Sequence, residues 1–165
     1  MLALLAAAGL GGQGDARRPF DHGAWVPLMH LFPEADVPVV QVALPVGWGA
    51  REVFALGQAL APLRRDGALV LGTGSMTREA APYVVEFSRW VEDAVVRNDR
   101  EALLDWPRRA PHAHRAHPTD DHFLPLFFTL GAAGWGGDTA PGVDWISREV
   151  MYGMLAMDAF AVAGA

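Results

Sequence analysis

Histidines and carboxylates gather at residues 112–122, just before an apolar run. The stretch ends in His117-Pro118-Thr119-Asp120-Asp121-His122. Thr119 is a typical helix N-cap residue, and the acidic residues after it suit the positive end of a helix dipole. His122 would then lie in the first helical turn, where the dipole favours the neutral imidazole that a metal needs. A histidine that only satisfies hydrogen bonds at a helix start fits the same pattern and is the more ordinary interpretation.

Other candidate groups are weaker when each is taken alone. The spacing of His112, His114, His117 and His122 matches no zincin or zinc-finger pattern, so histidines on a surface loop are the default expectation. Asp21-His22-Gly23 sets a carboxylate beside a histidine, but adjacency does not show that the side chains meet.

A glycine-rich stretch, Gly72-Thr73-Gly74-Ser75, also invites a chemical interpretation. It lacks the third glycine of a dinucleotide fingerprint and the lysine of a P-loop, and Ser75 does not fit a nucleophile elbow. We interpret it as a tight turn at the end of a strand.

The elements that must position these residues alternate between strand and helix. Val37–Leu44 and Ala68–Leu71 are apolar and predict two buried strands, with an amphipathic helix at Arg51–Arg65 between them. This order predicts a parallel, right-handed βαβ unit with Gly72 at the carboxyl end of a strand, where sites collect in α/β sheets. The expected fold class is α/β, a partial, mostly parallel central sheet flanked by helices.

The rest of the chain completes one domain, residues 1–165. A closing strand is expected at residues 150–162, with a helix as the alternative, after a loop at residues 134–142. Further helices are expected at residues 1–9, 23–32 (capped by Asp21), 82–98 and 100–106, and from Thr119 to Gly131 or Gly134.

Composition narrows the function classes. The chain has 165 residues and a net charge of −6, which disfavours non-specific nucleic-acid binding. It has no cysteine, so disulfides and thiolate metal sites are excluded, and a cytoplasmic location is expected. The apolar start, Met1 to Leu10, is too short for a membrane span and is interpreted as a core helix rather than a signal peptide.

Taken together, the motifs resemble the DOPA-type class III extradiol ring-cleavage dioxygenases, the LigB-like family. The resemblance runs in order along nearly the whole chain. It rests on Phe20-Asp21-His22-Gly23-Ala24-Trp25, Phe32 to Gln41, Leu56-Gly57, Leu63 to Gly67, Gly72 to Ser75, His117 to Leu126, and Tyr152 to Asp158.

The resemblance implies a function. In this family a ferrous iron, in a site that zinc can also occupy, chelates the two hydroxyls of a catechol and binds O2, and the aromatic ring opens beside the diol. Matched by motif, His122 resembles a metal ligand. His22 resembles the pocket histidine that moves a proton. The implied partners are a catechol-type small molecule and O2, with no nucleic acid and no membrane.

Two departures from the family pattern bear on activity. Family members carry two more metal histidines in an N-terminal half, within Gly-His-Gly-Ser-Pro and Ser-x-His-Trp motifs that are absent here. Arg78 also stands where the family has an active-site histidine, and a guanidinium can neither ligate iron nor act as a base. We therefore expect a truncated catalytic domain that is weak or inactive alone.

Three hypotheses follow for the role of the chain. A separate N-terminal polypeptide, or self-association, could complete the enzyme. Alternatively, the chain is a non-catalytic remnant or interaction module. An unrelated hydrolase that uses Ser75 is the third hypothesis, and we do not expect it.

Overall fold

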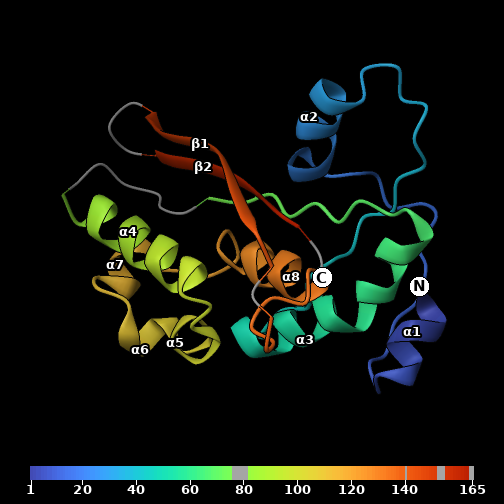
Figure 1. The fold of residues 1–165 in the computed structure, drawn as a ribbon. Coiled ribbons are helices and arrows are strands. Elements are labelled where there is room, and N and C mark those ends of the chain that lie inside the picture. Colours follow the sequence, from blue (N-terminus) through green and yellow to red (C-terminus); the bar gives the residue numbers. More distant parts are fainter. Residues whose placement is uncertain (76–81, 140, 152–154, 164–165) are drawn as a thin grey trace.

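Helices and one β-hairpin make up the described part of the chain. The computed structural model describes residues 1–75, 82–139, 141–151 and 155–163 (Figure 1). The helices are α1 (Leu2–Ala7), α2 (His22–Leu31), α3 (Ala50–Leu60), the 3-10 helix η1 (Ala61–Asp66), α4 (Pro82–Val96), α5 (Arg100–Leu104), α6 (Trp106–Arg109), α7 (Ala113–Ala116) and α8 (Leu124–Ala132). The strands are β1 (Val143–Met151) and β2 (Leu155–Val162).

The helices expected from apolar periodicity are largely confirmed. The helix expected at Arg51–Arg65 is present as α3 continued by η1, and Gly67 ends it in the left-handed conformation, at φ 84°. The pattern of α4 is also confirmed, since Val84, Phe87 and Val91 on its apolar face are buried. The helix expected at residues 100–106 divides into α5 and α6 around Asp105.

Helices α3 and α8 pack closely against each other. A Cβ added at Gly57 would overlap the carbonyl oxygen of Phe128, and one added at Gly131 would overlap the carbonyl oxygen of Phe54. The two backbones therefore approach each other through paired glycines, where no side chain fits. This contact fixes α8, and with it the turn that precedes α8.

The core is rich in aromatic side chains, and a histidine is part of it. Phe87, Trp106, Phe123 and Phe127 pack edge to face with ring centroids 5.1 to 6.1 Å apart. His117 is only 2% exposed and stacks on Phe123 at 4.8 Å. The expectation of a surface histidine is wrong here, because the apolar rings of α4, α6 and the α8 turn enclose it.

The two predicted parallel strands are not strands. Residues 37–44 and 68–71 belong to no ladder. Val40 and Leu69 are 67% and 70% exposed, whereas Val42 and Leu44 are half-buried against the core. The apolar run indicated a tendency to be buried, but a strand also requires a hydrogen-bonded neighbour. Neither segment has such a neighbour in the part of the chain that is described.

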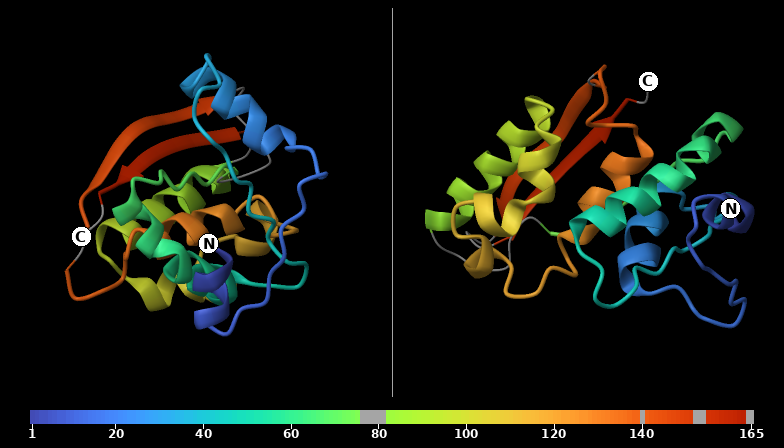
Figure 2. Two further views of the ribbon diagram at one scale, coloured as in Figure 1. Left: turned by 90° about the vertical axis from the view of Figure 1, so that its right-hand side faces the viewer. Right: turned by 90° about the horizontal axis from the view of Figure 1, so that it is seen from below.

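The sheet of the described chain is a two-stranded antiparallel hairpin. β1 pairs with β2 from Val143↔Val162 to Met151↔Leu155, with an irregularity between Trp145 and Ser147. The expected closing strand at residues 150–162 is confirmed over β2, whereas β1 was not predicted. Helix and sheet are thus both present, but the described residues contain no parallel central sheet. Figure 2 shows the hairpin along one side of α4 and α8, where Val143, Phe160 and Val162 pack against the core.

Candidate functional site

The segment Gly72–Ser75 lies between the two histidines predicted to form the site. The hydroxyl of Thr73 donates a 2.6 Å hydrogen bond to the carbonyl oxygen of Gly23, the residue after His22. Two residues later, the amide of Ser75 donates a 2.9 Å hydrogen bond to the carbonyl oxygen of His122. The structure therefore ties the start of α2 and the turn before α8 to one short segment.

The glycines of this segment allow close approach and do not form the predicted tight turn. A Cβ at Gly74 would overlap the carbonyl oxygen of His122, and a Cβ at Gly72 would lie 2.6 Å from the carbonyl oxygen of Pro125. Residues 71–75 are assigned no turn. The segment passes directly over the backbone before and inside α8, where a larger residue would push it away.

His22 is the first residue of α2, and its neighbour Asp21 acts as the helix cap. Oδ1 of Asp21 accepts from the amide of Ala24 at 3.1 Å, while Oδ2 accepts from the side-chain amide of Gln41 at 2.6 Å. Both carboxylate oxygens are thus bonded to groups other than His22. The imidazole of His22 is exposed and forms no hydrogen bond with the described residues. The predicted cap is confirmed, and the adjacent pair is not an Asp–His dyad.

His122 is held by the carboxylate beside it. Its Nδ1 lies 2.5 Å from Oδ2 of Asp121, whose Oδ1 accepts a 2.6 Å hydrogen bond from the hydroxyl of Thr119. A carboxylate at Nδ1 selects the tautomer that carries the proton there and the lone pair on Nε2. The side chain of His122 is 42% exposed.

The predicted cap of this helix is wrong. Thr119 bonds a side chain and no helical amide, and α8 begins only at Leu124, after a turn in which the amides of Phe123 and Leu124 donate to the carbonyl oxygen of Asp120. His122 therefore belongs to the turn and not to the first helical turn. Pro125 explains the later start, because a proline is best tolerated at the first positions of a helix.

The other histidines do not join His122. Nε2 of His112 lies 3.1 Å from a carboxylate oxygen of Glu86 on α4, His114 is exposed, and His117 is in the core. Among the described residues, no three His, Asp or Glu side chains come together in a way that could hold a metal ion. The described residues therefore do not by themselves fit a ferrous site, which needs at least three protein ligands. Arg78 lies outside the described residues.

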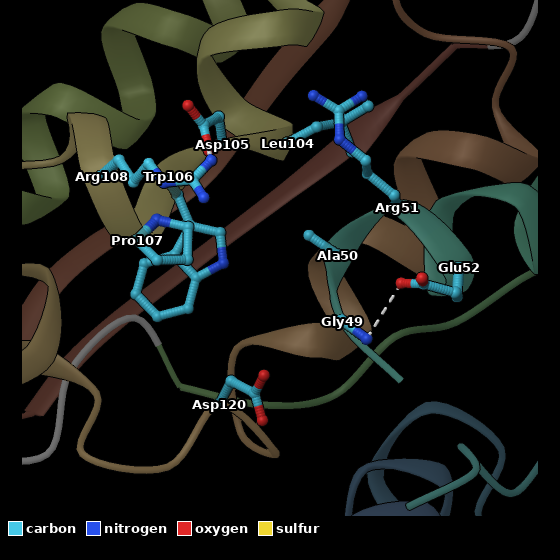
Figure 3. Close-up of a pocket in the computed structure, with 10 residues that line it drawn as sticks. All are labelled: Gly49, Ala50, Arg51, Glu52, Leu104, Asp105, Trp106, Pro107, Arg108 and Asp120. Atoms are coloured by element: carbon cyan, nitrogen blue, oxygen red, sulfur yellow. Dashed lines mark hydrogen bonds and ion pairs between the residues drawn. The ribbon is translucent and has the colours of Figure 1, made fainter. Parts of the chain in front are cut away.

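A shallow pocket of about 300 Å³ borders this region without containing either histidine (Figure 3). It is lined by Gly49–Glu52 at the start of α3, by Leu104–Arg108 around the α5–α6 junction, and by Asp120. Its two arginines are already paired with carboxylates, since Arg51 bonds Glu101 at 2.9 Å and Arg108 bonds Asp105 at 3.3 Å. It offers no uncompensated cation for an acidic ligand. The sequence analysis did not predict this pocket. The only local sign of it was the three-residue spacing of Asp105 and Arg108, which allows them to form an ion pair on one side of a helix.

Membrane insertion through a helix is not indicated by the described chain. Among the described residues, no helix is both long enough and apolar enough to cross a bilayer.

Comparisons with known proteins identify relatives along most of the chain. Residues 4–155 match the family described as the catalytic LigB subunit of aromatic ring-opening dioxygenase. A 4,5-DOPA dioxygenase extradiol of Beta vulgaris is 40% identical over 130 residues, covering 73% of this chain and 48% of the relative. The protein of that name from Escherichia coli K12 is 28% identical, covering 72% of this chain and 48% of the relative.

A solved structure supports the fold. The crystal structure of an uncharacterized protein from Escherichia coli K12 superposes with a TM-score of 0.79 at 24% identity, covering 98% of this chain and 69% of the other. The chain spans about half the length of the curated relatives that it matches. The family match along residues 4–155 nevertheless covers most of it, and the chain belongs to the LigB family of aromatic ring-opening dioxygenases.

Proposed function

We propose that this chain forms part of an extradiol dioxygenase that opens the ring of a catechol, of which DOPA is the model, with O2. The observation that carries the proposal is the pair of hydrogen bonds from Thr73 to Gly23 and from Ser75 to His122. They fix the two candidate histidines to one short segment of a chain whose relatives include proteins named 4,5-DOPA dioxygenase extradiol.

The two histidines receive different roles. His122 is proposed as a metal ligand through Nε2, with Asp121 as the carboxylate that orients its ring. His22 is proposed as the acid–base group that takes a proton from a catechol hydroxyl and later returns one. An exposed imidazole that bonds none of the described residues is suited to this role, because histidine exchanges protons near neutral pH.

The metal of the family is iron, and zinc fits the same kind of site. The described residues bring fewer than three ligands together, so retention of either ion would need ligands in addition to these residues. Activity of the chain alone is therefore proposed to be weak or absent. Further ligands would come from a complementing polypeptide or from self-association.

The domain organisation and the cellular location of the proposed enzyme are inferred from the sequence. We propose that residues 1–165 form a single, truncated catalytic domain. A cytoplasmic location is proposed because a chain without cysteine needs no oxidising compartment. A non-catalytic interaction module is the second candidate. It is favoured by the exposure of large apolar side chains such as Trp25, Val40 and Leu69.

Oxygen uptake tests the proposed activity. The chain is loaded anaerobically with Fe(II) and given DOPA, alone and together with the part of the Beta vulgaris relative that lies outside the match. We expect little uptake from the chain alone. Uptake by the combination should form a yellow ring-opened product and fall about 100-fold or more in His122→Ala.

His30→Ala is the matched control, because His30 is exposed at the opposite end of the helix that His22 begins. It should retain full uptake. Uptake by the chain alone would show that the inactivity prediction is wrong. The ring-opening proposal would be refuted if neither preparation consumed oxygen or retained iron.

A further inference from the structure

A second pocket, of about 270 Å³, lies between helix α4 and the β-hairpin, which Figure 2 shows side by side. We call it the α4–hairpin pocket. Of the described residues, those that line it are Val84, Val85, Ser88, Arg89 and Glu92 of α4, Arg148 of β1 and Asp158 of β2. The pocket contains neither candidate histidine, so what it binds does not depend on the ring-opening proposal.

Asp158 brings a carboxylate to this pocket without a counterion. Its Oδ2 is buried and accepts no hydrogen bond from the described residues. Arg148 stands opposite Asp158 in the ladder, but its guanidinium bonds Glu92 at 2.6 Å. The same guanidinium lies 4.8 Å from the centre of the Trp145 ring. The nearest cation on the hairpin is therefore engaged elsewhere, which leaves the carboxylate able to bind a hydrogen-bond donor.

Arg89 brings the opposite charge to the same pocket. Its side chain is exposed and forms no ion pair or hydrogen bond within the described chain. Arg89 and Asp158 both line the pocket yet do not bond each other, so space separates the two charges. The hydroxyl oxygen of Ser88 is also buried, and it too has no hydrogen-bond partner among the described residues. The pocket thus offers an unpaired cation, an unpaired carboxylate and a hydroxyl.

Simple occupants match these groups less well. An ordered water that bridges the buried oxygens takes up about 30 Å³, a small part of a pocket of about 270 Å³. A transition-metal ion needs at least three protein ligands, and no three His, Asp or Glu side chains come together in the described part of the chain. A molecule that carries both an ammonium and a carboxylate group matches both unpaired charges.

We propose that the α4–hairpin pocket binds a small α-amino acid with an apolar side chain. Its ammonium group would bond the carboxylate of Asp158 and the hydroxyl of Ser88, and its carboxylate would bond the guanidinium of Arg89. Val84 and Val85, on the same face of α4, offer the apolar side chain a contact surface. The volume of about 270 Å³ lies just below the range of pockets for drug-sized ligands, which suits a ligand of this size.

The empty pocket is unfavourable for the fold, which supports a binding role. Burial, with a further contribution from the charge of Glu92, raises the pKa of Asp158, so the ionised carboxylate is less stable in the folded protein than in water. Groups that reduce stability are typically found where a protein binds or reacts with a ligand. An ammonium group beside Asp158 would supply the missing positive charge.

An NMR titration with L-leucine tests the site. The isotope-labelled full chain is titrated with L-leucine, with isocaproate, which lacks the ammonium group, and with isoamylamine, which lacks the carboxylate. We expect L-leucine to give saturable shifts of amide signals in α4 and β2. Each truncated probe should bind about tenfold more weakly or worse, because one charge-assisted contact is lost. Asp158→Asn and Arg89→Gln should each weaken L-leucine binding by a similar factor.

Asp144→Asn and Arg18→Gln are the matched controls, since both residues are exposed and neither lines the pocket. They should bind L-leucine like the parent. The proposal is overturned if L-leucine gives no saturable shifts, the result expected of a pocket that holds only water. It is also overturned if either truncated probe binds as tightly as L-leucine, or if Asp158→Asn and Arg89→Gln both bind like the parent. Weaker binding by Asp158→Asn would not reflect unfolding, because this variant removes a destabilising charge.

Discussion

The hydroxyl of Thr73 donates a 2.6 Å hydrogen bond to the carbonyl oxygen of Gly23, fifty residues earlier in the sequence. The carbonyl belongs to the first turn of α2, and the hydroxyl belongs to a segment that is bonded through Ser75 to His122. This contact therefore links the start of α2 to the segment that bonds the backbone of His122.

Thr73→Val should release the start of α2. Valine has nearly the shape of threonine but leaves the partly buried carbonyl oxygen of Gly23 without its donor, at a cost of about 1 kcal/mol in unfolding free energy. Hydrogen exchange should accelerate in α2 and remain unchanged in α3. Thr139→Val is the control, because Thr139 is exposed and forms no hydrogen bond within the described chain. Equal exchange in both variants would contradict the role given to Thr73.

Gly57→Ala should destabilise the protein despite the better helix propensity of alanine. In an exposed helix this change would contribute up to about 1 kcal/mol of stability. At Gly57 the new Cβ meets the backbone of Phe128 in α8, which cannot rotate away as a side chain can, so we expect a net loss of about 1 to 3 kcal/mol. Gly14→Ala has open space around it and serves as the control. Urea unfolding of both variants measures the difference, and unchanged stability in Gly57→Ala would contradict the close helix contact.

The sequence was sufficient for the helices and insufficient for the sheet. Helical periodicity depends on residues within one segment, so Val84, Phe87 and Val91 marked the buried face of α4 correctly. The apolar residues 37–44 and 68–71 have strand character, but pairing depends on a neighbour that no local pattern can reveal. The segments consequently lack a ladder, and the sheet that does form joins β1 to β2.

For the candidate site, the sequence predicted a contact between near neighbours in the chain but not the contacts between distant residues. Asp21 capping α2 was predictable, because a cap lies three residues from the amide it bonds. The cap assigned to Thr119 was wrong, because its hydroxyl reaches the nearer carboxylate of Asp121. The approach of Gly74 to His122 spans 48 positions, and adjacency along the chain carried no information about it.

Asp121→Ala should change the tautomer of His122. With the carboxylate 2.5 Å from Nδ1, the neutral ring carries its proton on Nδ1, and without it we expect the more common tautomer protonated at Nε2. Long-range proton–nitrogen NMR spectra distinguish the two forms without any metal. Asp120→Ala is the control, since that neighbouring carboxylate forms no hydrogen bond within the described chain. An identical His122 spectrum in Asp121→Ala would contradict the orienting role of Asp121.

Asp158→Asn should make the protein more stable at neutral pH. Burial between the hairpin and α4, reinforced by the nearby charge of Glu92, raises the pKa of Asp158, and Arg148, which bonds Glu92 at 2.6 Å, opposes this shift. With a folded pKa above the unfolded one, the folded protein binds more protons between the two values, so stability falls as pH rises through that interval. The destabilisation caused by the ionised Asp158 persists at higher pH and disappears below the unfolded pKa.

Urea unfolding between pH 3 and pH 8 measures this effect. The free energy of unfolding of Asp158→Asn should increase relative to the parent as pH rises, whereas that of Asp144→Asn, at an exposed position on β1, should follow the parent. A constant difference across this range would contradict the assignment of a raised pKa to Asp158.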